Sequence, residues 1–345
     1  MEHETFKSET SRIKVAYHHL GRAGLPKLVL IHGDCSSSLF YLPLMQRLEE
    51  DYEMVALDLR GFGDTEPAFI DATRGMRDYS DDVDALMRAL GWERFSLLGW
   101  SMGGGVAMQY AIDYGEKLER LILVAPLSPF GFGGSYDADG KLYQPVGLAS
   151  GAGTVTPLLI NALRLGDRNF AITSIAKTYV RPGYAIPREE MELYIAGYLS
   201  TKLGEGLYPG DVVTAGTWPF VQAGVSGVNN AMSPKYCRLD GFADIPHKPP
   251  VLWVRGDQDV IICDGSICDV AYLGKVGMIP GYPGERIYPP QPMLAQTRYV
   301  LDQYQENGGV LHEVVLHSGH GPFLDNREAF VEELNRFFDV TEGAV

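Results

Sequence analysis

The feature that most constrains the fold of this chain is the alternation of short apolar segments with helical patterns over its first 125 residues. After an alternating strand pattern at 13–18, the segments 28–31, 54–57, 95–98 and 121–124 have the length and composition of buried strands. Helical spacing is found at 40–50, 80–90 and 106–114, and Ser80 is the expected N-cap of the second helix. Buried strands alternating with helices predict an α/β fold, a mostly parallel sheet with helices on both faces.

The alternation stops between Pro126 and Pro250. Gly-, Pro- and Tyr-rich stretches there surround helical segments at 157–165, 169–179 and 187–203, and none has the pattern of a central strand. The alternation then resumes with a strand at 251–254, a Gly- and Pro-rich loop at 263–292, a helix at 293–305, a strand at 311–316 and a helix at 327–338. We therefore expect one core, residues 1–126 and 248–345, and a large mainly helical insertion at 127–247.

Composition excludes several classes of function. The chain has 345 residues, 46% of them hydrophobic, and a formal net charge of −15, which disfavours binding to nucleic acids or anionic membranes. It has no apolar run of about 20 residues, and its polar, acidic N-terminus does not resemble a signal peptide. The four cysteines are too scattered for a disulfide framework or a zinc site. We expect free thiols, no metal and a cytoplasmic protein.

The strongest chemical signal is Gly99-Trp100-Ser101-Met102-Gly103, which lies where a predicted strand meets a predicted helix. This G-x-S-x-G pattern predicts a tight turn that presents the hydroxyl of Ser101 above the edge of the sheet. Side chains at the two glycine positions would collide in such a turn. Ser101 is therefore a candidate nucleophile.

A serine hydroxyl needs a base, and the base needs an orienting acid. The predicted strands at 251–254 and 311–316 lead into an acidic loop and a histidine loop, and the carboxyl ends of parallel strands meet at one edge of a sheet. We favour His320, between two glycines, over His317 at the strand end as the base. The acid is Asp257, Asp259 or Asp264. His18, His19, His247 and His312 are expected at the surface.

Acyl transfer also requires two backbone N–H donors for the oxyanion. One is expected at Met102, at the start of the helix after Ser101, and the other at Asp34, in the loop after the strand at 28–31. That loop, "IHGDCSSS", holds many reactive side chains, but we expect His32 to order it and one of Ser36 to Ser38 to cap the next helix. If the side chain of Asp34 faces the pocket, it should select for a polar or cationic substrate group.

Taken in order, "LVLIHGD", "ALDLRGFGDTEP", "LLGWSMGGGVAMQYA", "LILVAP", "VLWVRGDQDVI" and "SGHGPFLD" resemble the α/β-hydrolase superfamily. The resemblance implies an eight-stranded sheet, with the insertion at 127–247 as a cap between strands six and seven. It implies a catalytic triad of Ser101, Asp259 and His320, with Asp34 and Met102 as oxyanion donors. It also implies that Arg60 and Asp64 organise a structural turn. A serine at the elbow disfavours epoxide hydrolysis and dehalogenation, which use an aspartate there.

We therefore expect a serine hydrolase that cleaves an ester or lactone of a small to medium, largely apolar compound. Aromatic side chains of the cap, together with Trp100, Cys35 and Pro322, are expected to form a pocket closed from water. C–C or amide hydrolysis and perhydrolysis use the same residues, and a ligand-binding protein without turnover is a further alternative. A thiol enzyme based on Cys35 is disfavoured. A small-molecule substrate is the expected partner, without a cofactor, and a homodimer is left open.

Overall fold

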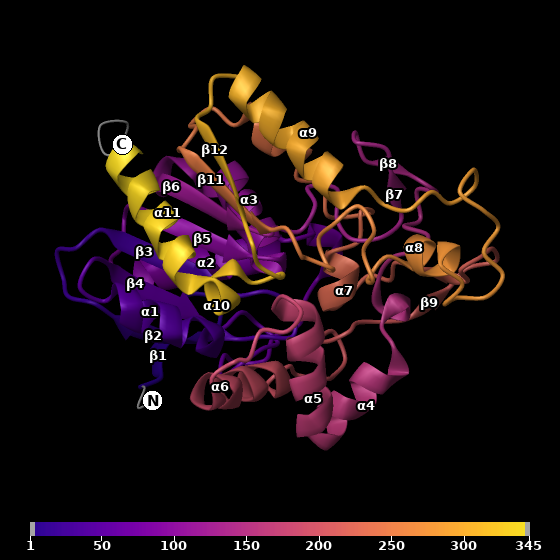
Figure 1. Cartoon of the computed structure of the whole chain (residues 1–345), viewed down its shortest axis with the longest axis horizontal. Coiled ribbons are helices and arrows are strands. Elements are labelled where there is room, and N and C mark those ends of the chain that lie inside the picture. The colour runs from indigo at the N-terminus through magenta and orange to yellow at the C-terminus, as the bar shows by residue number, and fades with distance from the viewer. Residues whose placement is uncertain (1–3, 342–345) are drawn as a thin grey trace.

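The computed structural model describes residues 4–341, and its centre is an eight-stranded sheet with helices on both faces (Figure 1). The strands lie in the order β1-β2-β4-β3-β5-β6-β11-β12. The pairs β1–β2 and β2–β4 are antiparallel, and all later neighbours are parallel. Their bounds are β1 Phe6–Glu9, β2 Lys14–Leu20, β3 Lys27–Ile31, β4 Glu53–Leu57, β5 Phe95–Trp100, β6 Leu118–Val124, β11 Val251–Gly256 and β12 Leu311–Leu316. The predicted fold class is confirmed.

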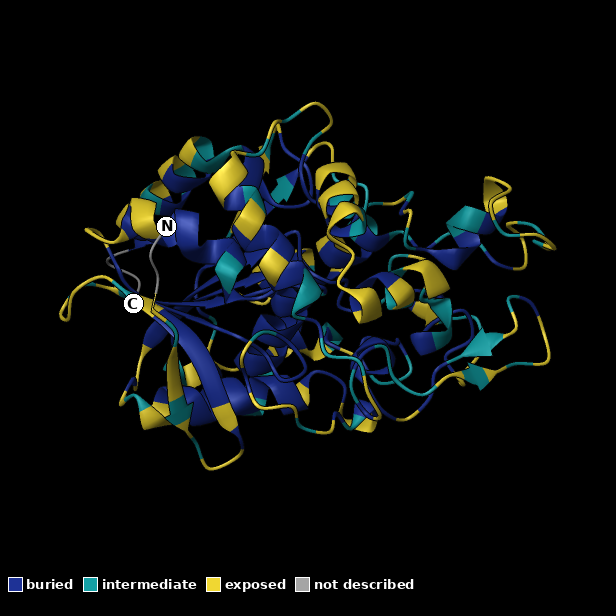
Figure 2. Cartoon of the chain, turned by 90° about the horizontal axis from the view of Figure 1, so that it is seen from below, coloured by how far each residue is buried: buried dark blue, intermediate teal, exposed yellow. Residues whose placement is uncertain are grey.

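The central strands are buried because helices cover them on both sides, as the dark interior of Figure 2 shows. All residues of β4 and β5 are buried, including the polar Glu53 and Ser96, and the others are apolar or glycine, as expected for strands covered on both faces. The helices of this core are α1 Leu42–Leu48, preceded by the 3₁₀ turn η1 Ser38–Tyr41, α2 Arg77–Ala89, α3 Met102–Tyr114, α9 Met293–Glu306, the short α10 Pro322–Asp325 and α11 Arg327–Thr341.

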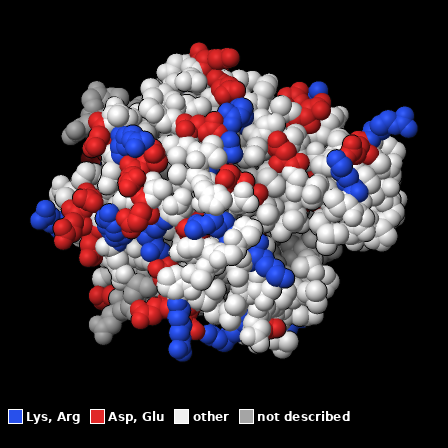
Figure 3. All heavy atoms as spheres, viewed as in Figure 1, with Lys and Arg blue, Asp and Glu red and all other residues white. Residues whose placement is uncertain are grey.

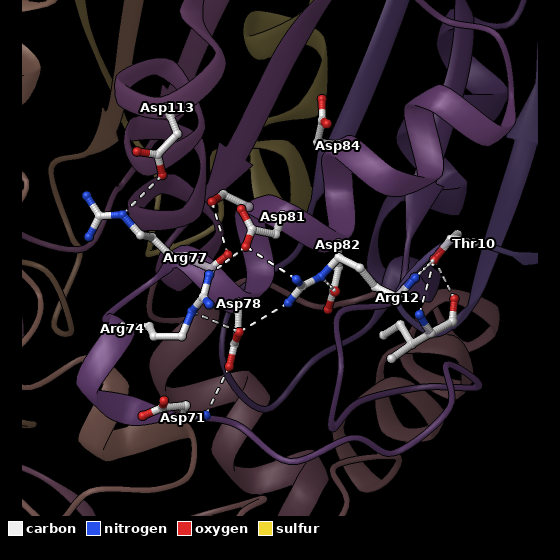
Figure 4. Close-up of polar contacts among 12 residues, drawn as sticks. Thr10, Arg12, Asp71, Arg74, Arg77, Asp78, Asp81, Asp82, Asp84 and Asp113 are labelled. Carbon is white, nitrogen blue, oxygen red and sulfur yellow. Dashed lines mark hydrogen bonds and ion pairs between the residues drawn. The ribbon is translucent and has the colours of Figure 1, made fainter.

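The second helix begins three residues before the predicted N-cap. Helix α2 starts at Arg77, and Ser80 is a buried residue inside it, with its hydroxyl donating to the Arg77 carbonyl. Ion pairs hold this end of α2, as Figure 4 shows, where Arg12 and Arg74 reach Asp78 and Asp81. The carboxylates of the first turns are therefore bound by arginines from outside the helix, which the local sequence does not reveal.

Arg60 organises the turn after β4, as predicted. Its guanidinium binds both oxygens of Asp82, at 2.5 and 2.7 Å, and donates to the Phe69 carbonyl. In the same turn Asp58 accepts hydrogen bonds from Ser38 and from the backbone of Asp64, and a Cβ at Gly63 would lie 2.0 Å from its carboxylate. Asp58 thus ties the loop after β3 to the loop after β4.

The segment between β6 and β11, called the cap segment here (residues 127–247), adds no strand to the central sheet. Its helices are α4 Pro157–Leu165, α5 Arg168–Ser174, the π-helical turn η5 Ile175–Tyr179, α6 Arg188–Leu199 and α7 Val228–Ala231. It also has two small hairpins, β7 Ser135–Tyr136 with β8 Lys141–Leu142, and β9 Val213–Thr214 with β10 Val221–Gln222. It lies beside the carboxyl ends of the parallel strands, from β7 and β8 at the upper right of Figure 1 to α4, α5 and α6 along the bottom. The bounds 127 and 247 stay a prediction.

Two further expectations are wrong. The segment 263–292, predicted as a loop, contains the helix α8 Val270–Lys275, whose N-cap is Asp269. His18, predicted at the surface, is buried in β2 and its Nδ1 lies 2.8 Å from the Glu4 carbonyl. All four cysteines are free thiols, as predicted. Within residues 4–341, no helix is both long and apolar enough to cross a membrane.

Candidate active site

Ser101 occupies a strained turn between β5 and α3. Its φ of 57° lies in the left-handed region, which costs a non-glycine residue free energy and persists only where the surroundings enforce it. Both flanking glycines are sterically required. A Cβ at Gly99 would lie 2.2 Å from the Gly103 carbonyl oxygen, and a Cβ at Gly103 would lie 2.3 Å from that of Ile31. The predicted collision therefore occurs, at Gly103 with the neighbouring strand β3.

His320 lies in the loop after β12 and is buried, and the side chain of its partner Asp259, from the loop after β11, is only 3% exposed. Oδ2 of Asp259 is 2.8 Å from Nδ1 of His320, so the carboxylate accepts a hydrogen bond from the imidazole. Oδ1 of Asp259 accepts the backbone N–H groups of Ile261 and Ile262, at 2.7 and 3.1 Å. These bonds fix the carboxylate and direct the second ring nitrogen, Nε2, away from it.

The alternatives left open by the sequence have other partners. Asp257 is exposed and binds Nδ1 of His317 and the N–H of Ser318, whereas Asp264 accepts the N–H groups that begin α9, at Leu294 and Ala295. His317 is exposed as well. Asp257 and Asp264 therefore stabilise turns and helix ends, and Asp259 is the carboxylate that contacts His320.

The histidine loop is held by Asp325, to which sequence analysis assigned no function, and by the predicted pocket residue Trp100. Asp325 of α10 accepts the hydroxyl of Ser318 and the N–H of Gly319, and Trp100 Nε1 donates to the His320 carbonyl at 2.9 Å. Asp325 also accepts the N–H of Arg181 from the cap segment. Only the "SGHGPFLD" motif pointed to this part of the chain.

Ser101 and His320 both line one cavity of about 380 Å³ between the core and the cap segment. Its walls are mostly apolar and include the predicted pocket residues Trp100 and Cys35, as well as the expected oxyanion donors Asp34 and Met102. Pro322 was predicted in the pocket but does not line it. It is buried as the first residue of α10, because the chain turns into this helix directly after Gly321.

The remaining walls come partly from cap aromatics, which the sequence predicted for the pocket, and partly from segments that it left unassigned. Five cap aromatics, the polar Asn229 of α7 and the loop after Asp259 contribute to them; these lining residues include Phe132, Phe170, Tyr179, Tyr198, Tyr208, Asn229, Ile261, Ile262, Ile267 and Cys268. The π-helical turn η5 supplies Tyr179, and π-helical turns are frequent at functional sites. No spacing in the sequence marks Asn229 as a lining residue.

The backbone N–H groups of Asp34 and Met102 are available to a ligand. In the described part of the chain neither donates a hydrogen bond, and Met102 is the first residue of α3, where the helix leaves its N–H groups unpaired. A Cβ at Gly33 would lie 3.4 Å from Ser101 Oγ, so the backbone before Asp34 passes close to the serine. This arrangement is what an oxyanion hole requires.

The rest of the loop after β3 has the predicted structural functions. The ring of His32 is buried, with Nδ1 2.7 Å from the Gly33 carbonyl and Nε2 accepting the Leu59 N–H, and burial lowers its pKa. Ser37 is the N-cap of η1. Burial raises the pKa of the Cys35 thiol well above its usual range, which disfavours a thiolate nucleophile.

The sequence left open whether the side chain of Asp34 faces the pocket. Asp34 is partly buried, lines the cavity and accepts the N–H of Cys35 at 2.9 Å. Burial raises the pKa of its carboxyl group to about 7. A carboxyl group therefore faces a mostly apolar pocket that Ser101 also lines.

Comparison with known proteins agrees with this geometry. Residues 28–333 match the model of the alpha/beta hydrolase family, and the chain belongs to that family. A 2-hydroxy-6-oxo-6-phenylhexa-2,4-dienoate hydrolase from Comamonas testosteroni is 26% identical over 259 residues, covering 72% of this chain and 77% of the relative.

Solved structures show the same fold. The enol-lactonase from Burkholderia xenovorans aligns with a TM-score of 0.60 and 16% identity, over 97% of this chain and all (100%) of that one. An esterase from Exiguobacterium antarcticum aligns with a TM-score of 0.59 and 19% identity, again over 97% and 100%. At these identities the likeness concerns the fold alone.

Proposed function

We propose that this chain is a serine hydrolase that cleaves a carboxylic ester or lactone of a small to medium, largely apolar substrate. The observation that carries the proposal is the buried Asp259–His320 hydrogen bond of 2.8 Å, beside a cavity that Ser101 also lines. Esterase and enol-lactonase structures with the same fold support this choice of bond.

In the proposed reaction, Ser101 Oγ attacks the substrate carbonyl carbon and its proton passes to His320. The oxyanion accepts the N–H groups of Asp34 and Met102, and Asp259 stabilises the imidazolium. The alcohol leaves with the proton from His320, which gives an acyl-enzyme on Ser101. Water then loses a proton to His320 as it attacks the acyl group, and that proton returns to Ser101 when the acid product departs.

A fluorophosphonate probe tests this proposal, combined with hydrolysis of p-nitrophenyl acetate, butyrate and octanoate. We expect one label per chain and turnover in the wild type, and neither in Ser101→Ala. Circular dichroism of the variant controls for folding. No label and no turnover in the folded wild type would contradict the proposal, and a label retained by Ser101→Ala would assign the nucleophile elsewhere.

Carbon–carbon hydrolysis is a second candidate, since the relative from Comamonas testosteroni is named for a dienoate substrate of that reaction class. The same three residues would serve it. The ratio of kcat/KM for 2-hydroxy-6-oxo-6-phenylhexa-2,4-dienoate to that for p-nitrophenyl butyrate separates the two candidates. A ratio well below one favours the ester or lactone, and a ratio well above one favours the second candidate.

A further inference from the structure

Asp34 places a carboxyl group in the cavity without a basic partner. Within residues 4–341 its hydrogen bonds come from Cys35 alone, from the N–H at 2.9 Å and from the thiol, and no Lys or Arg contributes to its electrostatic surroundings. A buried carboxylate without a compensating charge is costly and is normally paired. The unpaired state of Asp34 therefore calls for an explanation.

The groups that face Asp34 from the surrounding elements are all uncharged near pH 7. They are the thiols of Cys35 and Cys268 and the hydroxyl groups of Tyr79, Tyr179, Tyr198 and Tyr208. Burial raises the pKa of each of them. Arg60 interacts with Tyr79 as well, but its guanidinium is already bound by Asp82. The compensating charge is thus not supplied by the described protein.

A second acceptor in the same cavity also lacks a partner. Asn229 lines the cavity, and its Oδ1 is buried without a hydrogen bond within the described residues. Such an oxygen costs free energy unless a donor reaches it. The N–H groups of Val228 and Asn229 bind the carbonyls of Leu207 and Pro209, on either side of Tyr208.

Tyr208 connects the two acceptors. Its hydroxyl group interacts with the thiol of Cys35, the residue next to Asp34. Asp34 and Asn229 therefore belong to one side of the cavity, joined through the segment that carries Tyr208. Asp34 accepts hydrogen bonds from Cys35 alone and keeps free lone pairs, and Oδ1 of Asn229 has no donor among the described residues.

Aromatic rings complete this side of the cavity. Tyr179, Tyr198 and Tyr208 line it, and the ring of Trp100 meets that of Tyr179 at 5.2 Å between centroids. Aromatic faces attract cations by about 0.5–2 kcal/mol each, more when water is excluded. A carboxylate, a free amide oxygen and several rings together favour a positively charged group over a neutral one.

We propose that Asp34, Asn229 and the rings of Trp100, Tyr179, Tyr198 and Tyr208 form a subsite for a protonated amine. For the reaction itself this inference rests on the proposed function. The substrate is then an amine-bearing ester or lactone with an otherwise apolar body. The ammonium group gives two acceptors their donors and neutralises Asp34. A hydroxyl group would supply a single donor and leave the charge uncompensated.

Binding of n-hexylammonium, hexan-1-ol and hexanoate to the full chain tests the subsite, measured by isothermal titration calorimetry at pH 8 in 150 mM salt. We expect one hexylammonium per chain, bound at least about tenfold more tightly than hexan-1-ol. Asp34→Asn should remove that preference. Asp257→Asn is the matched control, since it deletes an exposed carboxylate outside the cavity and should keep the preference.

Equal affinity for the ammonium ion and the alcohol in the wild type would overturn the proposal. So would a preference that survives in Asp34→Asn, or one that Asp257→Asn also loses, which would reflect the net negative charge of the whole chain. Tighter binding of hexan-1-ol would assign the two acceptors to a neutral donor instead, and tighter binding of hexanoate would exclude the amine.

Two further measurements keep the test decisive if Asp34→Asn does not fold. Because the pKa of Asp34 is about 7, hexylammonium should bind about tenfold or more weakly at pH 5.5 than at pH 8. A change of pH could also affect binding through His320, which faces the same cavity, so a variant measured at constant pH is needed as independent evidence. Asn229→Leu should lower the hexylammonium affinity several-fold and leave the hexan-1-ol affinity unchanged. Constant hexylammonium affinity across this pH range and in Asn229→Leu would overturn the subsite.

The binding assay needs no turnover, so the two proposals fail separately. Selective amine binding without fluorophosphonate labelling would leave the subsite standing and reject the serine hydrolase. Labelling of Ser101 without amine preference would leave the hydrolase standing and reject the subsite.

Discussion

Residues 127–247 hold ten carboxylates and nine basic side chains, whereas the remainder of the chain carries almost the whole formal net charge of −15. On the face shown in Figure 3, acidic side chains gather toward the left, over the core, and the lower right is mostly uncharged. The proposed reacting groups come from loops of the core, while much of the cavity wall comes from the cap segment. The core thus supplies the proposed chemistry, and the cap segment shapes what can reach it.

The largest expected effect separates two carboxylates of the core loop after β11. Asp259→Asn should lower kcat/KM for p-nitrophenyl butyrate by about 10³–10⁴, because an amide can no longer hold His320 in the required tautomer. The matched variant Asp257→Asn should stay within about twofold. Similar losses in both variants would show that the loop as a whole, rather than the contact with His320, matters.

A pair of glycine variants contrasts the packing of the two regions. Gly103→Ala places a methyl group 2.3 Å from the Ile31 carbonyl oxygen, so the free energy of unfolding should fall by about 3 kcal/mol or more. Gly216 of the cap segment has open space where an added Cβ would lie, so Gly216→Ala should change the free energy of unfolding by less than about 0.5 kcal/mol. Urea denaturation measures both, and equal effects would contradict the contrast.

Asp34 lies at the boundary between the regions, and its stability effect should depend on pH. Its pKa is raised from 3.8 to about 7, so ionising it in the folded state costs free energy that grows as pH rises from about 4 to 7. Asp34→Asn removes this cost. The variant should match the wild type near pH 4 and exceed it by about 2–4 kcal/mol at pH 8 in urea denaturation. A gain that is the same at both pH values would contradict the burial of this carboxyl group.

The smallest effect concerns a contact between the regions. Arg327 of α11 binds both oxygens of Glu190 in α6, at 2.7 and 3.1 Å, and Tyr194 donates to the same carboxylate. Glu190→Gln should cost about 1–2 kcal/mol of unfolding free energy. Glu192→Gln, which breaks an exposed pair with Arg168 within the cap segment, should cost less than about 0.5 kcal/mol.

The contrast also explains what could be predicted from the sequence. The inner strands β3, β4, β5, β6 and β11 were predictable because residues buried on both faces are mostly apolar, whereas the exposed edge strand β1 was not predicted. The serine turn was predictable because backbone contacts exclude a side chain at Gly99 and Gly103. The contact between Asp259 and His320 agrees with the family spacing.

Errors arose where distant contacts decide the local structure. Helix α2 starts at Arg77 rather than after Ser80, and its carboxylate at Asp78 is bound by Arg12 from a distant segment as well as by the nearby Arg74. The aromatic residues of the cap segment predicted an apolar pocket but not its polar wall residue, since Asn229 is positioned by bonds to a segment some twenty residues earlier. No periodicity records such a contact.

The close packing of the histidine loop against the cap segment limits how freely these parts could be recombined. A Cβ at Gly319 would lie 2.3 Å from the backbone of Val180, Gly321 donates to the Tyr179 carbonyl, and Arg181 binds Asp325. A cap transplanted from another family member would have to reproduce the backbone path at 179–181. Otherwise the recipient loop would shift and carry His320 with it. The transferable unit for protein engineering is therefore the cap together with residues 317–325.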